Sequence, residues 1–300
     1  MAKRPKPVHQ MTVAQFEAMF PDEEACKHYL VKRRWPNGVE CPRCYNKKVF
    51  PVGTMPFKWQ CYECEKIEGA GYRFSLTVDT IFENTNKPLR DWFKVTHLML
   101  TSKKGISALQ IQRMMGFGSY ETAHGMCHKI RIALLEPEKQ LGGIVEVDET
   151  YIGGKSHNKH REKRTVRGGP GGKTPIIGAV SRKGKVIARV LSQIDKEDAQ
   201  KFVREVLADD VSLLATDESR VYDDLTEYPR GTVNHRAKQY VVGAIHTNTI
   251  EGFWSIFKRG VVGTFHKVSA KYMPLYVAEF QFRYNNRFNP DIFGTAIEAA

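Results

Sequence analysis

The stretch IVEVDETYIGGK carries three acidic side chains inside what otherwise reads as a short apolar strand. Because successive side chains of a strand point to opposite faces, we expect Glu146 and Asp148 on one face and Glu149 on the other. Two more acids, Asp217 and Glu251, follow later in the chain. Carboxylate oxygens are preferred ligands of Mg²⁺, and a pair of such ions can activate an oxygen nucleophile and neutralise charge at a phosphodiester. Asp148, Asp217 and Glu251 are therefore candidates for metal-dependent phosphodiester chemistry, whereas Glu149 on the other face would support the structure of the site.

Four cysteines form two CxxC pairs, Cys41 with Cys44 and Cys61 with Cys64. Each CxxC turn can direct two thiolates at one metal ion, and two such turns supply a closed tetrahedral site for zinc. The segments KKVFPVG and FKWQ between the pairs indicate two short strands of a zinc ribbon, which we place at residues 39–75. The ribbon has too few apolar residues to fold unaided, so we expect one structural zinc ion.

The charge of the chain indicates its partner. The 300 residues include 46 Lys and Arg against 33 Asp and Glu, which gives a formal net charge of +13. Such a surface attracts polyanions, and nucleic acid is the commonest large polyanion inside cells. Neither a secretory signal nor a run of about 18 apolar residues is found, so we expect a cytoplasmic, nucleoid-associated protein that binds DNA and no membrane.

Residues 88–138 have the pattern of a small helical domain. Three helical segments are joined by short glycine-containing turns, a spacing typical of a helix-turn-helix. The third segment follows Ser119 as its N-cap, and we expect it to expose side chains suited to phosphates and base edges. Those side chains are Tyr120, Thr122, His124, His128, Lys129 and Arg131. A helical spacer with a polar, solvated face is the alternative.

From residue 142 the pattern changes to alternating strands and helices. The stretch GIVEVDETYIGG is followed by two strands, PIIGAVSRKG and KVIARVLSQI, which are joined by a tight turn. A helix capped by Asp195 comes next, and then the buried strand VSLLATDES, which ends in Asp217. This order of three strands, a helix and a fourth strand is that of an RNase H-like α/β domain. It places Asp148 on the first strand and Asp217 at the end of the fourth, where neighbouring strands would bring them together.

The third acid lies in HTNTIEGFWSIFKRG, which reads as a helix. An apolar stripe on one face comprises Ile250, Phe253, Trp254 and Phe257. Glu251 and Lys258 are seven residues apart and therefore share the other face, two turns from each other. The helix would thus add a carboxylate and a positive charge to the two aspartates.

At these residues the chain resembles a known family. Asp148, Asp217 and Glu251, followed by Lys258, resemble the DDE motif of insertion-sequence transposases, and VEVDETYIGGK, HTNTIEGFWSIFKRG and EFQFRYNNR are similar to the zinc-ribbon (ISXO-like) group of bacterial DDE transposases. The resemblance covers nearly the whole chain from the ribbon onward. It implies two Mg²⁺ ions, or Mn²⁺ in their place, held by the three acids, with Lys258 on the terminal phosphates. Members of this group carry Asn as the third ligand, so whether Glu251 or the nearby Asn248 fills that role stays open.

The implied protein is a transposase that binds the terminal inverted repeats of an insertion sequence, cleaves them and transfers the strands to target DNA, as a homodimer or higher oligomer. Its fold class is α/β, or α+β overall. The expected domains are N-terminal helices (1–38), the zinc ribbon (39–75), the helix-turn-helix (88–138) and the RNase H-like domain (142–292). A basic loop at 155–173 is expected to bind DNA, or else to be a solvated linker. The alternative functions are a non-catalytic DNA-binding regulator and a related RNase H-like nuclease that cuts without joining.

Overall fold

The structure is a computed structural model, and it describes residues 11–64, 71–137, 140–154, 172–233 and 246–300. Most of the basic loop at 155–173 lies outside the described residues. The chain forms two compact units, of which the first comprises residues 1–102, 106–134 and 288–300 and the second residues 103–105 and 135–287. Among the helices of the described ranges, none has the length and apolar character needed to cross a membrane.

Helices of the first unit pack around an aromatic core. They include α1 (Val13–Met19), α2 (Glu23–Arg34), α4 (Leu89–Thr101), α5 (Ala108–Met115), α6 (Tyr120–Ala133) and α10 (Ile292–Glu298). Phe16 and Phe20 of the predicted N-terminal helices are buried. The ring centroid of Phe293, on α10, lies 5.5 Å from that of Phe20 and 5.6 Å from that of Phe93. The C-terminal helix is therefore part of the same core as the N-terminal helices.

The cysteine-rich segment forms a small antiparallel sheet. Strands β1 (Val49–Pro51), β2 (Lys58–Cys61) and β3 (Tyr72–Ser75) pair in the order β1-β2-β3. The first two are the predicted ribbon strands, and β3 adds a third. Trp59 of β2 stacks on Phe74 of β3, with ring centroids 6.0 Å apart, and Trp35 packs against both rings. These aromatic contacts cover one side of a sheet that is otherwise too small to hold a core.

Helices α5 and α6 agree with the predicted spacing but not with every predicted surface residue. Helix α5 ends at Gly116, which has a left-handed φ of +67°, and Ser119 caps α6 by accepting a hydrogen bond from the Glu121 N–H. The expectation that Arg131 is exposed is wrong, because only 1% of its surface is accessible. Arg131 follows the buried Cys127 by four residues and therefore lies on the packed stripe of α6.

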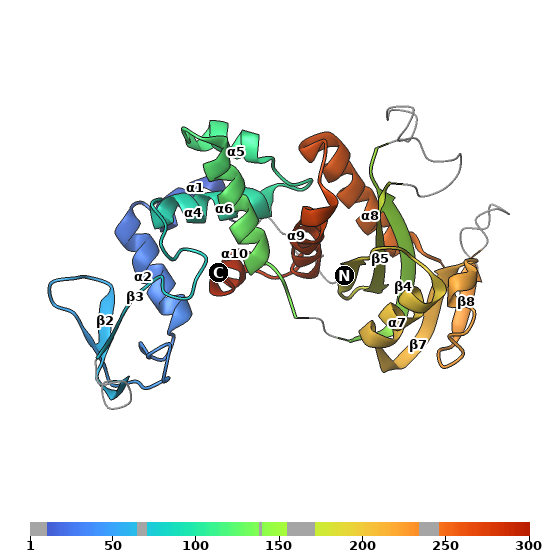
Figure 1. The fold of residues 1–300 in the computed structure, drawn as a ribbon, viewed down its shortest axis with the longest axis horizontal. Coiled ribbons are helices and arrows are strands. Elements are labelled where there is room, and N and C mark those ends of the chain that lie inside the picture. The colour runs from blue at the N-terminus through green and yellow to red at the C-terminus, as the bar shows by residue number, and fades with distance from the viewer. Residues whose placement is uncertain (1–10, 65–70, 138–139, 155–171, 234–245) are drawn as a thin grey trace, which may run out of the picture. The chain divides into compact units, whose positions relative to one another are not determined.

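A five-stranded sheet forms the centre of the second unit (Figure 1). Its strands are β4 (Leu141–Ile152), β5 (Thr174–Ser181), β6 (Val186–Val190), β7 (Leu207–Asp217) and β8 (Arg230–Val233), in the order β6-β5-β4-β7-β8. Strands β4, β5 and β6 form an antiparallel meander, whereas β7 runs parallel to β4 and β8 parallel to β7. Helix α7 (Lys196–Val206), capped by Asp195, precedes β7. The predicted order of meander, helix and fourth strand is confirmed.

Each face of this sheet is covered by helices. Val145 and Val147 of β4 pack with Phe202 and Val203 of α7 in one core. The opposite core joins the sheet to α8 (Asn248–Gly260) and α9 (Met273–Asn285). Shorter turns of helix in this unit are Arg220–Tyr222, the π-helical Val261–Phe265, and Ala270–Tyr272. Since the odd-numbered valines of β4 face α7, its even-numbered residues face α8.

Candidate active site and metal centre

Asp148 and Asp217 lie on neighbouring strands. Strand β4 pairs with β7 in parallel, with Glu146 beside Ala215. Two residues further along both strands, this register places Asp148 level with Asp217. Asp217 is the last residue of β7, and its Oδ1 accepts a hydrogen bond of 2.9 Å from the Ser219 N–H, which orients the carboxylate at the strand end. The two aspartates are thus carried by adjacent strands, as the sequence predicted.

Helix α8 adds the remaining predicted residues. Its apolar stripe is buried, as predicted, and consists of Ile250, Phe253, Trp254 and Phe257. Asn248, Glu251 and Lys258 are on its exposed side. Oε1 of Glu251 accepts a hydrogen bond of 2.8 Å from the Thr247 hydroxyl. The first turn of α8 therefore presents both candidates for the third ligand, a carboxylate and an amide, in one row.

Electrostatic interactions connect these residues. Burial, together with the negative charges of Asp217 and Glu251, raises the pKa of Asp148 to about 7. A hydrogen bond from the Glu149 backbone and the positive charge of Lys258 act in the opposite direction. A buried carboxyl group surrounded by like charges is stabilised as an anion when a cation is bound nearby, so this donor set fits a hard divalent cation.

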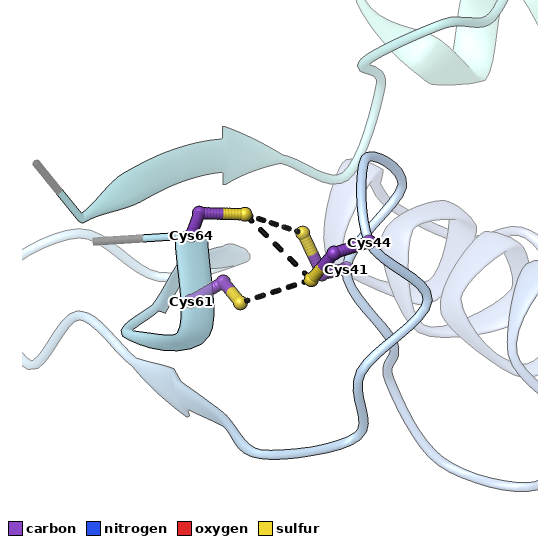
Figure 2. A group of neighbouring side chains, drawn as sticks. All are labelled: Cys41, Cys44, Cys61 and Cys64. Atoms are coloured by element: carbon purple, nitrogen blue, oxygen red, sulfur yellow. Dashed lines mark hydrogen bonds between the residues drawn. The ribbon is translucent and has the colours of Figure 1, made fainter. Parts of the chain in front are cut away.

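Four thiols converge in the ribbon, as Figure 2 shows. The Sγ atoms of Cys41 and Cys64 are 3.7 Å apart, and Sγ of Cys44 lies 3.6 Å from those of both Cys61 and Cys64. Tetrahedral zinc with Zn–S bonds of about 2.3 Å separates its sulfur ligands by about 3.8 Å, so the four thiols already have the spacing of a zinc site. Within the described residues, this is the only group of three or more His, Cys, Asp or Glu side chains whose ligand atoms all lie within 4.8 Å of one another.

Comparison with known families decides the identity of these two regions. Residues 140–285 match the ISXO2-like transposase domain, and residues 21–66 match the transposase zinc-ribbon domain. The chain carries an ISXO2-like transposase domain. The resemblance to insertion-sequence DDE transposases of the zinc-ribbon group is thereby confirmed, and the four cysteines lie within the matched zinc ribbon.

Similar proteins extend over much of the chain. A protein in transposable element ISH50 of Halobacterium salinarum is 28% identical over 281 residues, which are 88% of this chain and 91% of that protein. Among solved structures, a chain of a simian T-cell lymphotropic virus intasome in complex with the PP2A regulatory subunit B56 gamma is 13% identical, with a TM-score of 0.29. That match covers 63% of this chain and 65%, just under two thirds, of the intasome chain, and at this TM-score it supports no statement about fold or function.

Glu149 lies on the opposite face of the transposase sheet from Asp148. Burial, together with the charges of Asp217 and Asp148, raises its pKa to about 7. Tyr222, which packs in the core on the α7 side, is a neighbouring side chain that acts in the opposite direction and lowers the pKa. Glu149 therefore faces α7, on the opposite side of β4 from Asp148, as the alternation of side chains along the strand predicted.

Glu146 is the residue of the transposase domain to which the sequence assigned no role. Its side chain is fully buried, and it binds Arg182 and the first turn of α8. The sequence showed only that Glu146 is an acid two residues before Asp148 and on the same face of the strand. It could not identify the partners of Glu146, because these lie 36 and 103 residues away in the chain.

Proposed function

We propose that the protein binds the terminal inverted repeats of an insertion sequence and catalyses metal-dependent DNA cleavage and strand transfer. The supporting observations are that Asp148 and Asp217 lie level on the neighbouring strands β4 and β7, and that the charge of Glu251, on α8, acts on Asp148. The antiparallel meander followed by a helix and two parallel strands supports an RNase H-like fold for this domain. A homodimer or higher oligomer that holds two DNA ends is part of the proposal.

Divalent cations, when bound, would neutralise the charge that develops on the attacking and leaving oxygens of a phosphodiester. Asp148 and Asp217 would hold them, with Glu251 or Asn248 as the third ligand. Lys258, on the same exposed side of α8, would contact the terminal phosphates. Water is the nucleophile for cleavage and a DNA 3′-hydroxyl is the nucleophile for joining, so no cysteine or histidine nucleophile is needed.

Two observations favour Glu251 over Asn248 as the third ligand. The charge of Glu251 acts on Asp148, and the Thr247 hydroxyl holds its carboxylate in place. Asn248 is three residues earlier on the same side of α8, so its amide is the alternative. We expect Glu251→Gln to abolish cleavage and Asn248→Ala to reduce it only modestly; the reverse pattern would assign the ligand to Asn248.

The deciding experiment incubates the protein with its flanking terminal DNA and Mg²⁺. We expect Asp148→Asn and Asp217→Asn each to lower cleavage and joining by more than about 100-fold, because an amide cannot supply the charge that holds the metals. Terminal-DNA affinity should stay within about twofold of wild type, since neither change removes a positive charge. Asp224→Asn is the matched control, because Asp224 is an exposed acid paired with Lys196 outside the site.

The same assay separates the three candidate functions. Wild-type protein that binds terminal DNA but never cleaves it would be a regulator, and protein that cleaves without joining would be a nuclease. Wild-type cleavage rates in Asp148→Asn would contradict the catalytic role of the acidic residues.

We further propose that α5 and α6 form a helix-turn-helix that contacts DNA together with the ribbon. Tyr120 and Lys129 are exposed on α6, whereas the buried Arg131 is excluded as a DNA contact. We expect Tyr120→Ala to reduce discrimination between terminal and random DNA. Lys129→Ala should weaken both equally and lower the salt slope by about 0.9 if it removes one phosphate contact. If neither change has these effects, the DNA-contacting surface lies elsewhere.

A further inference from the structure

The buried carboxylate of Glu146 holds the start of α8. Oε2 of Glu146 accepts hydrogen bonds from the backbone N–H groups of Thr249, at 2.7 Å, and Ile250, at 3.1 Å. Oε1 accepts a third, at 2.8 Å, from the Thr249 hydroxyl. None of the Glu146 side chain is exposed. One strand residue therefore makes three hydrogen bonds to a single helical turn.

This arrangement replaces an ordinary helix cap. The first N–H groups of a helix lack partners within the helix, and a side chain just before the helix usually accepts from them. Thr247 occupies that position but makes no such bond, and its hydroxyl instead donates to Glu251. Glu146 satisfies the N–H groups from the sheet, and its negative charge is favourable at the positive end of the helix dipole. The start of α8 is thus held by β4.

Arg182 compensates the buried charge and adds a second connection to the start of α8. Its Nε donates to Oε1 of Glu146 at 2.7 Å, and its Nη2 donates at 2.9 Å to the carbonyl of His246, just before the helix. Nδ1 of His246 lies 3.2 Å from the same Glu146 oxygen. The turn after β5, the strand β4 and the approach to α8 are therefore joined around one carboxylate.

A close packing contact fixes the next turn of α8. Gly178 pairs with Asp148 across the β4–β5 ladder. A Cβ atom at Gly178 would lie 2.6 Å from the Trp254 ring, so only glycine lets this ring approach the sheet so closely. Glu251 lies between the turn held by Glu146 and the turn held by Trp254. Its position relative to Asp148 is therefore set from both sides.

We propose that Glu146, compensated by Arg182, is a positioning residue that fixes the first turn of α8, so that Glu251 and Asn248 are presented to the site of Asp148. Glu146 acts through α8 and is not itself a ligand. The inference that this placement serves catalysis rests on the proposed function, whereas the placement of the helix does not.

The test uses full-length, zinc-loaded protein and three measurements: hydrogen exchange in the first turn of α8, terminal-DNA affinity, and the Mg²⁺ concentration for half-maximal cleavage. In Glu146→Gln we expect exchange at Thr249 to Glu251 to become at least about tenfold faster. The Mg²⁺ concentration should rise roughly 10- to 100-fold, as is typical when an outer partner of a metal site is lost. DNA affinity should change less than about twofold.

A double variant separates positioning from stability. Glu146→Gln alone leaves the positive charge of Arg182 without its partner, which destabilises the fold, and Arg182→Met removes that charge. Glu146→Gln/Arg182→Met should therefore recover most of the melting temperature. If Glu146 positions α8, fast exchange and the raised Mg²⁺ requirement persist in the double variant. If its role is only structural, both return to wild-type values and the proposal is overturned.

Glu205→Gln is the matched control, because it makes the same chemical change in an ion pair with Arg189 whose carboxylate side chain is 42% exposed. It should leave all three measurements unchanged. Fast exchange in Glu146→Gln together with wild-type protein that cleaves no DNA would support the placement of α8 and reject the proposed function. Unchanged exchange in Glu146→Gln, with active wild-type protein, would reject the positioning role alone.

Discussion

Asp148 is an acid that the fold makes difficult to ionise. Burial and two neighbouring carboxylates raise its pKa to about 7, and the positive charge of Lys258 does not offset them. Such a group reduces the stability of the metal-free protein at neutral pH, and a bound cation reverses that effect. The arrangement is thus unfavourable for the fold alone and favourable for metal binding.

The first prediction is the pH dependence that follows from this pKa. Between the ordinary aspartate pKa of about 4 and about 7, folded protein keeps a proton on Asp148 that the unfolded chain has released. Without Mg²⁺ or Mn²⁺, the free energy of unfolding should therefore fall as pH rises through this window and level off above it. Glu149 contributes with the same sign, since its pKa is also raised to about 7.

Denaturant unfolding at several pH values checks this. Asp148→Asn should make the decline shallower and be more stable than wild type at about pH 8, by no more than about 1.4 kcal/mol for each pH unit of the window. Adding Mg²⁺ should stabilise wild type but not Asp148→Asn. Asp224→Asn should leave the slope unchanged, because the ion pair with Lys196 lowers the pKa of Asp224, out of the window. An identical slope in Asp148→Asn would contradict the assignment.

At the scale of residues, the sequence predicted what depends on local spacing. Alternation along one strand assigned Asp148 and Glu149 to opposite faces, and the two CxxC pairs predicted the thiol cluster. It did not predict the role of Glu146, because this depends on a helix that begins about a hundred residues later. Arg131 was assigned to the surface from its charge, although its four-residue step from Cys127 placed it on the packed stripe.

Among the elements, the ribbon should depend most on its metal. Cys41, Cys61 and Cys64 are buried, and burial together with the neighbouring thiols raises the pKa of Cys64, so the Cys64 thiol stays protonated in the metal-free ribbon. We predict one zinc ion per chain, lost in Cys61→Ser, with the ribbon unfolding when the metal is removed. Metal analysis and near-UV circular dichroism under reducing conditions provide the measurement. Cys127→Ser, outside the cluster, should keep its zinc; zinc-free wild-type protein with an intact ribbon would rule this out.

Helix α9 protects the edge of the transposase sheet. Strand β6 is an edge strand, so one row of its backbone groups lacks a neighbouring strand. Asn285 accepts from the Val186 N–H at 2.7 Å and donates to the Val186 carbonyl at 3.0 Å, and Gln281 accepts from the Ala188 N–H at 2.9 Å. The amides in the stretch EFQFRYNNR thus take the place of a further strand.

We predict that Asn285→Leu lowers the free energy of unfolding by roughly 2–5 kcal/mol, because two buried backbone groups of Val186 lose their partners. Urea unfolding measures this, and light scattering should show increased self-association through the exposed edge. Asn286→Leu is the control within the same motif, since Asn286 donates to Glu136 and Phe282 and not to β6. Equal effects of the two changes would show that the edge contact is not the cause.

Elements with strong periodicity were predicted well. The apolar stripe of α8 and the cap of α7 appear as expected, because one face of each helix is buried within its own unit. Strand β3 was missed, since its four residues become a strand only by pairing with β2. The edge contacts of α9 were not predicted, because the residues they join lie 99 and 93 positions apart in the chain.

At the scale of the whole molecule, the chain leaves the first unit for the second and then returns. Sequence patterns extended the second domain to residue 292, whereas contacts assign residues 288–300 to the first unit. Local periodicity cannot reveal this, because the partners of α10 are the N-terminal helices. Phe293 is 3% exposed, and its ring lies among those of Phe16, Phe20, Tyr29 and Phe93.

We predict that Phe293→Ala destabilises the first unit by roughly 3–5 kcal/mol, the usual cost of removing a buried aromatic ring. Hydrogen exchange should increase in α1, α2 and α4 but not in the strands of the second unit. Phe288→Ala is the matched control, because Phe288 is 52% exposed and should be nearly neutral. Destabilisation confined to the second unit would contradict the assignment of α10.

The return of the chain also sets an order for biosynthesis. A ribosome translates every residue of the second unit before it reaches α10, so a nascent chain possesses a complete central sheet while the aromatic core of the first unit still lacks Phe293. Domains generally fold as units when their residues emerge. The N-terminal helices and ribbon, although translated first, can therefore complete their aromatic core only after the last residues of the chain have left the ribosome.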